Sequence, residues 1–132
     1  MNAYEEYQTM PLSLSFEEME RLHGRMLAAI GSDQDALELY NELLEKAFRY
    51  ANTRAEWTLL SLSERANADS ARTSLHNSLI VKFNQLARYL AQMQQDTSWR
   101  SELGYEEENP YNRKRIGDMA CYLAFVCGCC SR

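Results

Sequence analysis

Few residues in this chain break regular backbone structure. Its 132 residues include only two prolines and five glycines, and no segment alternates apolar and polar residues with the period of two that predicts a half-buried strand. Long segments instead repeat apolar residues at spacings of three and four, which places them on one face of an α-helix. The sequence therefore predicts an all-α fold, a single-domain helical bundle of four main helices with room for a fifth short one.

Length and composition fit one ordinary globular domain. A single core can bury most of the apolar surface of 132 residues, whereas two domains of half that length would each be marginal. The contents of 45% hydrophobic and 25% charged residues are typical of folded proteins rather than disordered ones. We therefore expect residues 1–132 to form one helical domain, with an N-terminal extension at 1–14 and a frayed tail at 128–132.

Residues that begin and end helices set the predicted boundaries. Ser15 and Glu18 have the spacing of a capping box, and Gly31 stands where a helix C-terminus favours glycine. Asn109 followed by Pro110 supplies an N-cap and a proline at the first helical position. The predicted helices span residues 15–30, 32–62, 69–94 and 110–127, with Gly128 stopping the last one. The polar stretch 61–70 fits either a connection or more helix, and residues 99–109 fit a loop or a short helix.

The charge of the chain is acidic and unevenly distributed. Nineteen acidic and 14 basic residues give a formal charge of −5, which disfavours binding to nucleic acid and to anionic membranes. Residues 1–48 hold 10 of the acidic residues and only three of the basic ones, so the first two predicted helices carry the acidic excess. We expect these N-terminal helices to bind a basic protein partner. A purely solubilising acidic face is the alternative.

The sequence predicts a cytoplasmic protein with reduced thiols. Residues Met1 to Glu6 lack the basic and apolar segments of a secretory signal. The longest nearly uncharged run, Met119–Ser131, is shorter than the roughly 20 residues that a transmembrane helix needs. All four cysteines lie within the last twelve residues, where no disulfide among them could join distant segments.

No motif predicts a cofactor, a metal or a catalytic centre. Glu20 and His23 have the spacing of half a di-iron motif, but the second copy is missing, because Thr73 stands three residues before His76. His23 is therefore expected on the surface. The C-terminal cysteines lack the two separated pairs of a zinc site, and phosphate-loop, dinucleotide and serine-nucleophile motifs do not occur in the sequence.

A polar cluster is the best candidate for a functional site. The predicted 69–94 helix carries an apolar stripe that continues backwards onto His76 and then Arg72. The stripe consists of Leu79, Phe83, Leu86, Leu90 and Met93. Two polar side chains therefore point toward the core, where a cation needs a partner or water. Asp118, near the start of an otherwise apolar helix, is the expected counter-ion. The candidate cluster consists of Arg72, His76, Asn84, Arg88 and Asp118.

This cluster has two interpretations. In the first, Arg72 or Arg88 pairs with Asp118 in a sealed network that fixes helix register. In the second, the two guanidinium groups and the imidazole of His76 bind a small anion such as phosphate or carboxylate, in a binding protein or an enzyme. The sequence favours the first, and with it a non-catalytic interaction or regulatory protein. The small-anion binder or enzyme is the alternative.

The second half of the chain resembles a known family. The resemblance covers residues 70–126 and rests on the motifs Arg72-Thr-Ser-Leu-His76-Asn77, Phe83-Asn84-Gln-Leu-Ala-Arg88, Trp99-Arg100-x-x-Leu-Gly104 and Asn112-Arg113-Lys-Arg-Ile-Gly117-Asp118-x-Ala-Cys121-Tyr. These motifs are similar to those of an uncharacterised family of small helical bacterial proteins that are often found on mobile genetic elements. The resemblance implies a small helical protein of a bacterial cytoplasm. It assigns no activity and no site residues.

Overall fold

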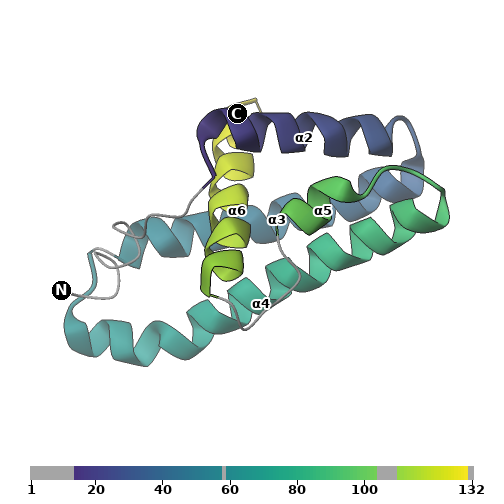
Figure 1. The fold of residues 1–132 in the computed structure, drawn as a ribbon. Helices are drawn as coiled ribbons and strands as arrows, with labels where there is room; N and C mark the ends of the chain where they lie inside the picture. Colours follow the sequence, from purple (N-terminus) through teal and green to yellow (C-terminus); the bar gives the residue numbers. More distant parts are fainter. Residues whose placement is uncertain (1–13, 58, 104–109, 131–132) are drawn as a thin grey trace.

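The described part of the chain folds into helices (Figure 1). The computed structural model describes residues 14–57, 59–103 and 110–130, and these residues contain no strand. The predicted all-α class, with four main helices and one short one, is confirmed. Most of the predicted N-terminal extension lies outside the described residues. The helices are α2 (Phe16–Ile30), α3 (Gln34–Trp57), α4 (Leu62–Gln92), α5 (Ser98–Glu102) and α6 (Pro110–Cys130).

The helix α3 is the central element of the fold. It packs along α4 and also against α6. In Figure 1, α2, α3 and α4 run back and forth along the length of the molecule, and α6, in yellow, crosses them. The short helix α5 lies between α2 and α4 and contacts both. Near the start of α2, the rings of Phe16 and Tyr122 lie 5.2 Å apart, so α6 also reaches α2.

The predicted apolar faces of α2 and α4 form much of the core. The apolar spacing of α2 predicts an inward face of Met19, Leu22, Met26 and Ile30, of which Met19 is half-buried and the other three are at most 2% exposed. The stripe on α4 is buried from Leu79 to Leu90, whereas Met93 at the C-cap is 47% exposed. Spacings of three and four residues therefore identified the inward face of both helices correctly, and the last member of the stripe on α4 is the exception.

The helix α6 is buried on one side only. Ile116, Met119 and Leu123 are at most 2% exposed, but Phe125 is 64% exposed. The sequence is apolar almost all round from Ile116 onward, which predicts a helix surrounded by others. That prediction is wrong for one face, because the neighbouring helices cover the side that carries Met119 and leave Phe125 open. No helix in the described residues, α6 included, has the length and apolar character that a bilayer span requires.

The boundary between α3 and α4 differs from the prediction. The apolar rhythm predicts one helix as far as Leu62, but α3 ends at Trp57 and Ser61 caps α4. The Ser61 hydroxyl accepts a hydrogen bond from the Glu64 amide at 3.2 Å, and the Glu64 carboxylate accepts one from the Ser61 amide at 2.9 Å. Arg65 donates to the Trp57 carbonyl at 3.0 Å. This capping box starts a new helix and satisfies backbone groups that the break leaves open.

Gly31 and Gly128 have different roles. Gly31 has a φ of 56° and follows α2, as predicted. Gly128 lies inside α6, which continues to Cys130, so the prediction that it stops the helix is wrong. A Cβ atom at Gly128 would lie 3.6 Å from the Phe48 ring, so the glycine packs against α3 instead. The predicted frayed tail therefore begins as helix, and residues 131–132 lie outside the described part.

Substitution by alanine should change the free energy of unfolding differently at the two glycines. Gly31→Ala should lower the free energy of unfolding by about 1 kcal/mol, because a side chain is strained at positive φ. Gly128→Ala should leave it unchanged or raise it by about 0.5 kcal/mol, because helix propensity improves and the new Cβ meets only an ordinary contact. Urea titration measures both variants. A loss in G128A as large as that in G31A would mean that α6 ends at Gly128.

Candidate functional site

Asp118 pairs with an arginine that the sequence analysis did not single out. Its carboxylate accepts a hydrogen bond from Arg54 Nη1 at 3.0 Å, and Asp118 is only 8% exposed. The prediction that Arg72 or Arg88 of α4 pairs with Asp118 is wrong. The reason is the packing of α6 on α3, which brings Asp118 to the last turn of α3. Arg54 Nη1 also lies 3.4 Å from Cys121 Sγ.

Arg72 and His76 contact aromatic rings. The guanidinium carbon of Arg72 lies 4.5 Å from the centre of the Trp57 ring, a cation–π contact between α4 and α3. His76 is buried beside Tyr50, with the ring centres 5.7 Å apart. An aromatic face therefore accommodates the Arg72 cation that was expected to need a carboxylate.

Asn84 binds a buried arginine that sequence reasoning missed. The side-chain carbonyl of Asn84 accepts a hydrogen bond from Arg100 Nε at 2.8 Å, and Arg100 is 1% exposed. Trp99 and Leu103, on either side of it, are fully buried and anchor α5. Their spacing of four residues was the available signal, because it marks one buried helical face next to Arg100. Arg88 is exposed.

The predicted site residues contact different parts of the structure and do not share one set of neighbours. Asn84 and Arg88 line a hollow of about 310 Å³ together with Thr97. Asp118 lines a different and larger groove. In the described part of the chain, neither Arg72 nor Arg88 forms an ion pair with Asp118. The anion pocket stays a prediction.

The larger groove lies between α2, α3 and α6. It has a volume of about 710 Å³ and opens to solvent. Two aromatic side chains that line it are well exposed, Phe16 at 50% and Phe125 at 64%. Most of the lining is apolar, and the ion pair described above adds a polar spot. The lining residues are Phe16, Met19, Ala51, Arg54, Ala55, Asp118, Cys121, Tyr122 and Phe125.

His23 belongs to a buried hydrogen-bonded chain and not to the surface, which corrects the prediction. Its Nε2 lies 2.7 Å from the Tyr40 hydroxyl, which in turn lies 3.5 Å from Cys127 Sγ. Its ring lies nearly perpendicular to the ring of Tyr122, with the ring centres 5.6 Å apart. Burial lowers the pKa of His23 and raises that of Tyr40. The chain thus joins α2, α3 and α6.

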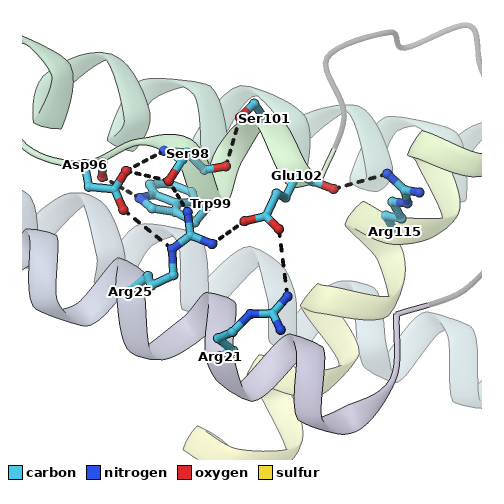
Figure 2. Close-up of polar contacts among 8 residues, drawn as sticks. All are labelled: Arg21, Arg25, Asp96, Ser98, Trp99, Ser101, Glu102 and Arg115. Atoms are coloured by element: carbon cyan, nitrogen blue, oxygen red, sulfur yellow. Dashed lines mark hydrogen bonds and ion pairs between the residues drawn. The ribbon is translucent and has the colours of Figure 1, made fainter.

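A polar network fastens α5 to α2 (Figure 2). Arg25 of α2 donates to the Glu102 carboxylate and to the Ser98 hydroxyl, and its Nε lies 3.5 Å from Asp96. Arg21, one turn earlier, lies 3.8 Å from Glu102. Hydrogen bonds from Ser98 lower the pKa of Asp96, with Arg25 adding to the effect. Both arginines of α2 are therefore occupied by carboxylates on the α5 side.

Comparison of the chain with known protein families, with curated proteins and with solved structures finds no match. The family resemblance of residues 70–126 therefore stays a prediction. Among the described residues, no group of three or more histidine, cysteine, aspartate or glutamate side chains could hold a metal ion. Function has to be inferred from the geometry of the site and its chemistry.

The partner of Asp118 can be tested by two matched substitutions. Arg54→Ala should lower the free energy of unfolding by about 2–3 kcal/mol, because it removes a charged hydrogen bond from a buried carboxylate. Arg72→Ala removes the same charge but only a cation–π contact, so the loss should be about 0.5–1 kcal/mol. Urea titration at neutral pH compares the two. The reverse order would show that Asp118 depends on Arg72.

The buried histidine predicts a pH dependence of stability. Burial holds the pKa of His23 below its ordinary value of 6.5, so the unfolded chain takes up the proton first as the pH falls. The contribution of His23 to stability is therefore complete above pH 6.5 and is lost as the pH falls through 6.5 toward the lowered pKa. His23→Gln cannot titrate and should show a smaller loss between about pH 7.5 and about pH 5.5. Identical pH profiles, from urea titrations of both proteins, would contradict this role.

Proposed function

We propose that the protein is a non-catalytic interaction or regulatory protein of the cytoplasm, which binds a segment of another protein in the groove between α2, α3 and α6. The observation that carries this proposal is the pair of exposed aromatic side chains, Phe16 and Phe125, on an open and mainly apolar groove. Large aromatic residues are costly to leave in water and are enriched at the centres of protein interfaces.

The chemistry of the groove supports binding over catalysis. Arg54 and Asp118 are paired with each other, so neither is an unoccupied acid, base or anion-binding group. Burial raises the pKa of the Cys121 thiol, and Arg54 opposes this only in part. A thiol held protonated is a weak nucleophile. These groups give the groove polarity without giving it a reactive centre.

The thiols support a reducing compartment. Cys121 and Cys127 carry reduced thiols on α6, and each has a hydrogen-bonding neighbour. Free thiols are typical of proteins that work in the cytoplasm. The bacterial origin implied by the family resemblance fits the same compartment.

The groove can be tested by capture experiments with matched variants. Phe125→Glu places a charge on the groove, and Val81→Glu places one on α4 at a side chain that is 49% exposed and outside the groove. Each protein is immobilised and incubated with a lysate of the native host, and the retained proteins are identified by mass spectrometry. We expect a protein that the wild type and V81E retain and F125E loses.

Circular dichroism first confirms that each variant is folded. The sets of proteins retained by the wild type, V81E and F125E then test the proposal. Retention of the same proteins by F125E and wild type would overturn the groove as the binding site. Equal loss in V81E and F125E would show that the captured proteins respond to any added charge. Retention should also weaken as salt rises from about 0.1 M to about 0.5 M, because the N-terminal helices are acidic.

A further inference from the structure

We propose that the segment bound in the groove is an amphipathic helix of a partner protein, with basic residues along the edge that faces Glu17 and Glu20. This inference rests on the proposed function and names the chemistry of the partner. It follows from three features of the structure: the pairing of both α2 arginines with carboxylates on the α5 side, the position of Glu20 beside the groove, and the helical walls of the groove.

On α2, the two arginines lie away from Phe16, whereas Glu20 lies on the side of Phe16. Arg21 and Arg25 face α5, where Glu102 and Asp96 neutralise them (Figure 2). At 100° per residue, Glu20 projects within 40° of Phe16, on the opposite side of the helix from Arg25. Glu17 follows Phe16 in the first turn. The arginines that could neutralise these glutamates within α2 are thus already occupied elsewhere.

Glu20 brings acidic charge close to the groove, and neither Glu20 nor Glu17 is neutralised by a described residue. Burial and the nearby Glu20 carboxylate raise the pKa of Tyr122, a residue that lines the groove. Glu17 and Glu20 are exposed and form no ion pair with any described residue. A binding segment that covers Phe16 therefore meets uncompensated carboxylates beside it, and lysine or arginine is the complementary chemistry.

The walls of the groove favour a helix as the bound segment. All three walls are helices, and the described residues contain no strand whose edge an extended peptide could join. Peptides that bind between helices commonly do so as amphipathic helices, with apolar residues at spacings of three, four and seven in the groove. The exposed rings of Phe16 and Phe125 are the apolar surface that such residues would cover.

Synthetic peptides test this chemistry without knowledge of the partner. The Lys peptide has leucines on one helical face and lysines along both edges, the Glu peptide replaces these lysines by glutamates, and a scrambled Lys peptide spreads the leucines over all faces. Each carries fluorescein, and binding to the full chain is measured by fluorescence anisotropy. We expect the wild type to bind the Lys peptide about tenfold more tightly than the other two peptides. The difference in affinity between the Lys and Glu peptides should become smaller in high salt.

Protein variants locate the binding. Glu17→Gln with Glu20→Gln should weaken binding of the Lys peptide about three- to tenfold, whereas Glu38→Gln with Glu42→Gln removes two charges from α3, away from the groove, and should change it little. Phe125→Glu should abolish the difference in affinity between the Lys peptide and the scrambled Lys peptide, because this difference depends on the leucine face.

The outcomes separate this inference from the proposed function. Equal affinity for the Lys and Glu peptides would overturn the basic edge, and equal affinity for the Lys and scrambled peptides would overturn the helix. Failure of every peptide to bind, while a lysate protein is still retained by V81E and lost by F125E, would overturn the inference and leave the groove as the binding site. Capture of a second copy of this chain would also overturn the proposal that the partner presents a helix with a basic edge.

Discussion

The packing of α6 across α3 is the contact on which the rest of the structure depends. It buries Ile116, Met119 and Leu123 in the core, and full burial of such side chains stabilises a fold by about 1.5–3 kcal/mol each. The same crossing brings Asp118 to Arg54 and Tyr122 to Phe16. The partly buried ion pair and the groove that it lines are therefore consequences of one helix crossing.

The fastening of α5 to α2 has a different physical character. The carboxylates that bind Arg21 and Arg25 are about half exposed, and exposed ion pairs contribute little to stability. Burial of Trp99 and Leu103 holds α5 in place. The network mainly fixes which way the arginines of α2 point, and thereby leaves acidic charge on the side of the groove. A surface interaction of small energy thus shapes the binding surface.

Local signals predicted local structure well. Ser15 begins α2, Gly31 ends it, and the apolar stripe on α4 is buried from Leu79 to Leu90. The Ser61 capping box is visible in the sequence and predicts the break before α4, but the apolar rhythm runs through it and predicts one continuous helix. Gly128 could not be interpreted locally, because a glycine that packs against another helix and one that ends a helix look alike in sequence.

By itself the sequence determined the all-α class, most helix starts and the inward faces of α2 and α4, because caps and helical periodicity act over a few neighbouring residues. Only the tertiary structure decided that Asp118 meets Arg54, 64 residues away, while Arg72 meets Trp57. It also decided that Arg100 is buried and that Phe125 is open. The physical reason is that periodicity gives the direction of a side chain relative to its own helix axis, whereas its partner depends on which other helix packs there.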